Sequence, residues 1–272
     1  MAVFKKYNLI DEVIGMRIDL NSDLGESFGA YTMGHDELVI PSVTSVNVAC
    51  GFHGGDPTVI QQTVEMAVKH NVAVGAHPGF PDLLGFGRRN IVMDAKDVYS
   101  MMIYQIGAVR AFTDLFNIPL QHVKPHGALN NMAAVDADLA MAIAKSIRDY
   151  DKDLILLAVA GTELAKAGEK VGLPVAQEVF ADRNYEPNGT LRPRKYSDAL
   201  IRDPEESFRR VLRMVQDHVI EAIDGTLVPV QPDSVCLHGD GPTAVKLAET
   251  LRRELTAHGV EVRSLASDVG AN

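Results

Sequence analysis

MRIDLNSDLGESFG, residues Met16–Gly29, is the stretch that decides the fold. Its first residues alternate, with Ile18 and Leu20 between polar neighbours, and this two-residue periodicity is typical of a half-buried β-strand. Leu24 and Gly25 then turn the chain. We therefore predict that the folded part of the chain starts with a short strand that ends at this turn.

The other face of this strand is polar. It carries Asp19, Asn21 and Asp23 in register, and Glu26 follows directly after the turn. Burial of carboxylates is costly unless a cation or hydrogen-bond donors pair with them. An acidic edge at the end of a first strand therefore indicates a metal, a cationic partner or proton-transfer chemistry.

Four later segments share one pattern, an apolar run followed by a histidine with glycine or proline beside it. They read NVACGFHGGDP, VAVGAHPGFPD, QHVKPHGAL and SVCLHGDGP, and their histidines are His53, His77, His126 and His238. The pattern places these histidines at the carboxyl ends of strands. That is the edge at which α/β folds build their active sites.

Apolar runs alternate with helical patterns along the chain. Strands are expected to begin near Arg17, Val43, Val72, Leu120, Leu154, Pro174 and Ser234, with a short edge strand over 261–265. Helices are expected from 203 to about 223 and from 241 to 258. Strict alternation of strands and helices predicts a parallel sheet.

No GxGxxG follows the first strand and no GxxxxGK[ST] occurs, so the fingerprints of dinucleotide-binding and phosphate-loop folds are absent from the sequence. The predicted fold class is α/β. We expect a single (β/α) barrel domain of seven or eight parallel strands over residues 16–272, preceded by an N-terminal extension over residues 1–15.

Charge and cysteine content exclude several classes. The formal net charge is −10 and the pI is about 5.3, so neither a basic nucleic-acid footprint nor a polybasic membrane patch is present. There are only two cysteines, which fits a reducing compartment. No apolar stretch is long enough to span a membrane. We expect a cytoplasmic protein that acts on a small-molecule substrate, with no nucleic-acid or membrane partner.

The histidines and the acidic strand admit two interpretations. An aspartate with two or three histidines suits a borderline divalent ion such as Zn²⁺ or Mn²⁺, and the tentative ligands are His53, His77 and Asp19. Without a metal, the same groups would transfer protons and hydrogen-bond a polar substrate.

Lys124 lies two residues before His126, so both side chains are expected on one face of their strand. A lysine inside a barrel needs an anion, and Asp19, Asp23 or a substrate carboxylate would serve. The alternatives, an internal salt bridge and a substrate contact, carry equal weight. Arg88 is a candidate for phosphate or carboxylate capture, and Asp182 is a candidate to join the acidic cluster.

The motifs together resemble the LamB/YcsF family over about residues 17–265. The resemblance rests on DLNSDLGESFG, NVACGFHGGDP, VGAHPGFPDLLGFGRR, VKPHGALNN, EVFADRNYEPNGTLRPR and CLHGDGP. It implies a (β/α) barrel of the glycoside hydrolase/deacetylase type. It also implies hydrolytic opening of the 5-oxo-L-proline lactam to L-glutamate, coupled to ATP hydrolysis, in a complex with the 5-oxoprolinase B and C subunits.

For that chemistry, Asp23 is the expected general base, with Asp19 and Glu26 in support. Candidates for proton transfer or metal binding are His53, His77 and His126, and Lys124 would hold the substrate carboxylate or stabilise oxyanion charge. Candidate substrate-binding residues are Asn21, Glu26, Arg88, Asp182 and His238. ATP is expected to be handled mainly by partner subunits.

Two alternatives remain. One is a metal-dependent deacetylase or deformylase of a small N-acyl compound. The other is a non-catalytic subunit that carries an unstable intermediate for a partner.

Overall fold

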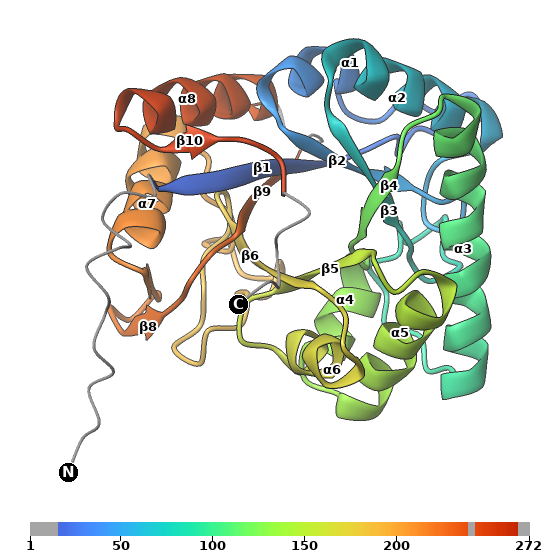
Figure 1. Ribbon diagram of the computed structural model, residues 1–272. Helices are drawn as coiled ribbons and strands as arrows, with labels where there is room; N and C mark the ends of the chain where they lie inside the picture. Colours follow the sequence, from blue (N-terminus) through green and yellow to red (C-terminus); the bar gives the residue numbers. More distant parts are fainter. Residues whose placement is uncertain (1–15, 239–242, 266–272) are drawn as a thin grey trace.

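Seven parallel strands form a closed barrel in the computed structural model, which describes residues 16–238 and 243–265 (Figure 1). Strand β9 pairs with β6 on one side and with β1 on the other, and this closes the ring. The strands are β1 (Arg17–Leu24), β2 (Ser45–Ala49), β3 (Ala73–His77), β4 (Leu120–Val123), β5 (Ile155–Val159), β6 (Val175–Phe180) and β9 (Ser234–His238). The predicted barrel is confirmed, and each strand begins within about two residues of its expected start.

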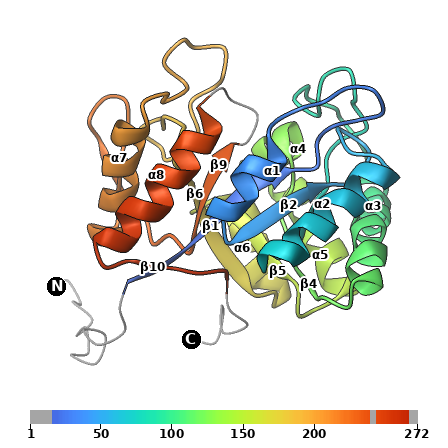
Figure 2. The same cartoon turned by 90° about the horizontal axis from the view of Figure 1, so that it is seen from above.

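Helices cover the outside of the barrel, with α7 and α8 on one side and α2, α3 and α5 on the other (Figure 2). Their bounds are α2 (Pro57–His70), α3 (Ala95–Leu115), α5 (Ala137–Tyr150), α6 (Glu163–Val171), α7 (Pro204–Gln216) and α8 (Ala244–Ala257). Three shorter helices, α1 (Asp36–Val39), η2 (Ile40–Ser42) and α4 (Gly127–Ala133), lie between strands in the sequence. None of the helices in the described ranges is long and apolar enough to cross a bilayer.

The segment after α7 differs from its prediction. The helix expected to reach about residue 223 ends at Gln216, and an antiparallel hairpin of β7 (Val219–Glu221) and β8 (Leu227–Pro229) follows. The chain leaves the helix through His218, whose φ of 56° is left-handed. The hairpin turns at Asp224-Gly225, a pair that favours hairpin turns between apolar runs. Turn chemistry therefore overrides the helical pattern here.

Three predictions concern the two ends of the barrel domain: the edge strand, the start of the last helix and the N-terminal extension. The expected edge strand is present as β10 (Glu261–Val262), which pairs in parallel with the start of β1. The last helix begins at Ala244, whereas Gly241, its expected start, lies outside the described residues. The expected extension over residues 1–15 also lies outside them.

The barrel interior is polar. Register aligns Asp19 with Ser234 across β1 and β9, and Asp23 with Asn47 across β1 and β2, and all four side chains are buried. Gly75 on β3 makes room for the ring of His122 on β4, since a Cβ at position 75 would collide with that ring. The apolar core lies instead between the strands and the surrounding helices, as parallel sheets require.

Candidate active site

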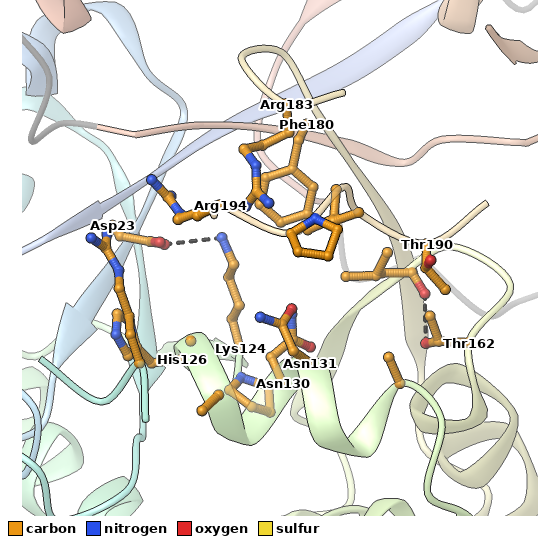
Figure 3. Close-up of a pocket in the computed structure, with 18 of the residues that line it drawn as sticks. Asp23, Lys124, His126, Asn130, Asn131, Thr162, Phe180, Arg183, Thr190 and Arg194 are labelled. Atoms are coloured by element: carbon orange, nitrogen blue, oxygen red, sulfur yellow. Dashed lines mark hydrogen bonds and ion pairs between the residues drawn. The ribbon is translucent and has the colours of Figure 1, made fainter. Parts of the chain in front are cut away.

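A cavity of about 590 Å³ opens at the carboxyl ends of the barrel strands (Figure 3). Strand ends contribute Asp23, His77, Phe180 and His238 to its wall, and Lys124 directly follows β4. Asn130 and Asn131 reach it from helix α4, and Arg183 and Arg194 from the loop after β6. This is the face at which barrels of this kind carry their chemistry.

Lys124 lies at the centre of a buried charge cluster. Its ammonium Nζ is 2.9 Å from Oδ1 of Asp23 and 2.9 Å from Oε1 of Glu178. It also contacts Sγ of Cys236 at 3.0 Å and Oδ1 of Asn21 at 3.2 Å, and only 2% of the residue is exposed. The internal salt bridge, one of the two interpretations of this lysine, is therefore present, and two carboxylates compensate one cation.

The two carboxylates differ in their pKa. Burial disfavours the charge on Asp23, but the neighbouring His77 and Lys124 outweigh it and hold the pKa of Asp23 well below its ordinary value. Burial raises the pKa of Glu178, and the opposing effect of Lys124 is smaller. Of the two carboxyls, Asp23 therefore has the stronger preference for the ionised form.

Asp19 is deeper in the barrel and outside the cavity wall. Its carboxylate accepts hydrogen bonds from the hydroxyls of Thr44 at 2.7 Å, Ser45 at 2.9 Å, and Ser234. Asp19, one of the three possible anions for Lys124, bonds to these hydroxyls instead, because its position on β1 lies further from the mouth of the barrel than that of Asp23. The structure therefore separates Asp19 from the other tentative metal ligands, His53 and His77.

The environment of Asp19 predicts a pH effect on stability. Burial raises the pKa of Asp19 from 3.8 to about 6. The folded state then retains a proton that the unfolded state has lost, so this group lowers the free energy of unfolding as pH rises from about 4 to about 6. We expect urea denaturation to show Asp19→Asn gaining about 2 kcal/mol on the wild type between pH 4 and pH 7.

The exposed Asp94→Asn variant serves as the control and should keep a constant difference from the wild type. A constant difference for Asp19→Asn across the same range would contradict the assigned shift.

Asn21 supports the charge cluster rather than facing the cavity. It is fully buried and donates from Nδ2 to Glu178 and to Ser234, at 3.0 and 2.8 Å. Its Oδ1 accepts from Asn47 at 2.7 Å, and Asn47 in turn accepts from His122 at the same distance. The structure thus places this candidate substrate-binding residue behind Lys124, where it orients the lysine.

Three histidines and Glu26 form a second buried group beside Asp23. The rings of His53 and His126 stack with centroids 3.7 Å apart, and Nδ1 of His126 is 2.9 Å from Nε2 of His77. That Nε2 is 3.4 Å from Oδ2 of Asp23. Burial, with the neighbouring histidines, holds the pKa values of His53 and His126 well below the ordinary value. The three histidines, which were expected at the carboxyl ends of strands, lie together here, and with Glu26 their donor set has the composition of a metal site.

The opposite rim is basic. Both ring nitrogens of His238 have partners there, since Nδ1 lies 2.8 Å from Oδ2 of Asp182 and Nε2 lies 3.0 Å from Arg194. Burial opposes the charge on Asp182, but His238 outweighs it and lowers the pKa of this carboxyl. Arg88 lies on the side of the histidine group instead, where it lines the cavity and stacks over the ring of Phe86, which contacts His53 and His126. Asp182 therefore orients His238 at the rim and does not join the acidic cluster of β1.

Sequence reasoning missed several members of the site. Glu178 is a charged residue within the otherwise uncharged strand VAQEVF, and a lone charge in a buried strand signals a partner inside the barrel. Arg183 is 5% exposed, and burial together with Arg194 lowers its pKa to about 10. Asn47 and His122 gave no such signal, because their contacts depend on the register of neighbouring strands.

The fold and the cavity define the class of protein. It is a (β/α) barrel that carries a buried group of lysine, carboxylates and histidines at the carboxyl ends of its strands. Within that class, the sequence profile of the LamB/YcsF family matches residues 18–269, and the chain belongs to this family.

Curated relatives cover nearly the whole chain. The A subunit of 5-oxoprolinase from Halalkalibacterium halodurans is 52% identical over 250 residues, which are 92% of this chain and 97% of that protein. The corresponding A subunit from Geobacillus thermodenitrificans is 50% identical over 92% of this chain and 98% of its own length. The crystal structure of a lactam utilization protein from Thermus thermophilus superimposes with a TM-score of 0.88 at 47% identity, covering 92% of this chain and 100% of that one.

Proposed function

We propose that this chain is the A subunit of a 5-oxoprolinase, which hydrolyses the lactam of 5-oxo-L-proline to L-glutamate while ATP is hydrolysed to ADP and phosphate. One observation carries the proposal: relatives of that name are about half identical over 92% of the chain. The cavity adds chemical support, because it combines an ionised carboxylate, histidines and guanidinium groups in one space.

A five-membered lactam is a poor electrophile. Transfer of a phosphoryl group from ATP to the amide oxygen would make its carbon reactive. A water molecule would then attack that carbon, the C–N bond would break with proton transfer to nitrogen, and a second water would release phosphate from the glutamyl phosphate. The two water molecules, ATP and the lactam balance glutamate, ADP and phosphate.

Asp23 is the group placed to accept the proton of the attacking water, because it is ionised and faces the cavity. Arg88, Arg183 and Arg194 line the same cavity and suit the substrate carboxylate, which guanidinium groups bind in a fork. Lys124 already has two carboxylate partners, so its role is to fix Asp23 and to contribute positive charge beside the reacting oxygen.

ATP is handled mainly with the partner subunits in this proposal, because the sequence has no phosphate loop. The names of the curated relatives describe one subunit of a larger enzyme, and the B and C subunits of 5-oxoprolinase are the proposed partners. A divalent metal would belong with His53 and His77, from which Asp19 lies apart.

Glutamate release by the purified chain tests the proposal. We expect little or no release from the chain with ATP and 5-oxo-L-proline, and release once the B and C subunits are added. The complete system without ATP is the control and should be inactive. ATP-coupled release by the chain alone would contradict the need for partners, and no release from the complete system would contradict the function.

The group of buried histidines supports a second candidate function, that of a metal-dependent deacetylase or deformylase. It predicts hydrolysis of small N-acyl compounds that needs no ATP and stops on chelation. The same purified chain, assayed with such compounds, separates the two functions.

A further inference from the structure

Four buried residues from separate segments direct their side chains to one point: Glu26 after β1, His53 after β2, His77 at the end of β3 and His126 after β4. We call them the histidine cluster. One ligand atom from each lies within 4.8 Å of every other. Oε1 of Glu26 is 3.5 Å from Nε2 of His53 and 3.6 Å from Nδ1 of His126. All four side chains are more than nine-tenths buried.

The hydrogen bonds of His77 and His126 fix the proton positions. Nδ1 of His77 lies 2.7 Å from the carbonyl oxygen of Lys124, and Nε2 of His126 lies 2.8 Å from that of Phe86. A carbonyl oxygen only accepts, so both of these nitrogens donate. When both rings are neutral, the remaining nitrogen of each has no hydrogen. These two nitrogens face each other at 2.9 Å with lone pairs opposed, an arrangement that needs a positive centre between or beside them.

His53 needs a partner as well. It is 1% exposed, and neither of its ring nitrogens has a hydrogen-bond partner among the residues that the structure describes. A buried polar group without a partner costs free energy, and a bound ion is one of the arrangements that would offset this cost. One proton shared by His77 and His126 would relieve their contact but would leave His53 unsatisfied.

We propose that the histidine cluster binds one divalent metal ion of the borderline class, with Zn²⁺ as the best fit, through Glu26, His53, His77 and His126. Three imidazoles and one carboxylate are a donor set that Zn²⁺ takes up in tetrahedral geometry. Two nitrogens at ~2.0–2.1 Å from a shared zinc ion lie about 3.3 Å apart in such a tetrahedron, close to the observed spacing of His77 and His126. The stacked rings of His53 and His126 must tilt from parallel for both lone pairs to reach the ion.

The backbone carbonyls of Lys124 and Phe86 orient two of the proposed ligand histidines. Each accepts from the second nitrogen of a ligand ring, the arrangement that fixes the tautomer of metal-bound histidines. Asp23, Cys236 and His238 form another group of possible ligands, but Nζ of Lys124 already lies 2.9 Å from Asp23 and 3.0 Å from Cys236. A second cation there would be repelled, so the metal belongs to the histidine cluster.

Direct metal binding to the full chain tests this proposal without any assay of activity. The chain is stripped with a chelator and titrated with Zn²⁺ by calorimetry, and with Co²⁺ by visible absorption, which reports tetrahedral coordination. We expect one ion per chain and intense Co²⁺ bands. Glu26→Gln and His53→Gln should each weaken binding of Zn²⁺ by at least ~10²-fold, since loss of a supporting residue alone commonly costs 10–100-fold.

His238→Gln is the matched control, because this histidine lies at the same cavity but outside the cluster. It should bind Zn²⁺ with the affinity of the wild type. Melting of each metal-free variant checks that it is folded. No stoichiometric binding by the wild type, or loss of binding in His238→Gln with retention in His53→Gln, would overturn the assignment. Because the readout is binding, its failure is distinct from failure of the proposed lactam hydrolysis.

Discussion

Asp23→Asn is expected to lower turnover in the assembled system by about 10²–10⁴-fold, the usual contribution of general acid–base catalysis. The amide keeps the shape of the side chain and can still accept from Asn47 and Lys124, which lie 2.8 and 2.9 Å from Oδ1. It cannot take a proton from water. Glutamate release per folded molecule is the measurement.

Stability separates catalysis from a structural role in this variant. Lys124 keeps Glu178 as a partner at 2.9 Å when Asp23 loses its charge, so the free energy of unfolding should fall by less than the about 3–5 kcal/mol typical of an uncompensated buried charge. Asp19→Asn is the matched control on the same strand, outside the cavity, and should retain turnover. Normal turnover together with a large fall in melting temperature would assign Asp23 a structural role only.

Lys124→Met is expected to produce the largest loss of stability, about 3–5 kcal/mol in the free energy of unfolding. The variant leaves Asp23 and Glu178 buried without their cation, and methionine fills the space but carries no charge. One of the carboxyls must then take up a proton, so the loss should be greater at pH 8 than at pH 5. Urea denaturation at the two pH values measures it.

Two comparisons make the lysine experiment decisive. The exposed Lys96→Met variant should unfold like the wild type. Adding Glu178→Gln to Lys124→Met should recover part of the lost stability, because one of the two orphaned carboxylates is removed. Wild-type stability of Lys124→Met, with loss of turnover alone, would show that the lysine serves the substrate and not the internal ion pair.

The barrel could be predicted from the sequence because its signals are local. Apolar runs that alternate with helical patterns place all seven strands, and period-two alternation in β1 puts Asp19, Asn21 and Asp23 on one face. The hairpin of β7 and β8 differs from the predicted helix, because the helical pattern of α7 continues into it and only the Asp224-Gly225 pair signals the turn.

The site was only partly predictable, because its contacts depend on depth and register. Asp19 and Asp23 share a strand face, yet one meets hydroxyl groups inside the barrel and the other meets Lys124 at the mouth. The partnership of Lys124 and Glu178 joins strands whose relative stagger is fixed only when the barrel closes. The sequence shows which residues carry charge, but the closure of the barrel determines which charged side chains come into contact.

The double pairing of β9 has a consequence for synthesis on the ribosome. Its residues, Ser234–His238, pair with β6 on one side and with β1 on the other. The other six strands of the barrel are synthesised before it, so the ring cannot close until β9 has been made. Until it arrives, β1 and β6 present unpaired edges, and Asp19 lacks the hydroxyl of Ser234. A nascent chain that stalls before this strand is therefore expected to expose two unpaired strand edges, so its risk of aggregation should be greatest late in translation.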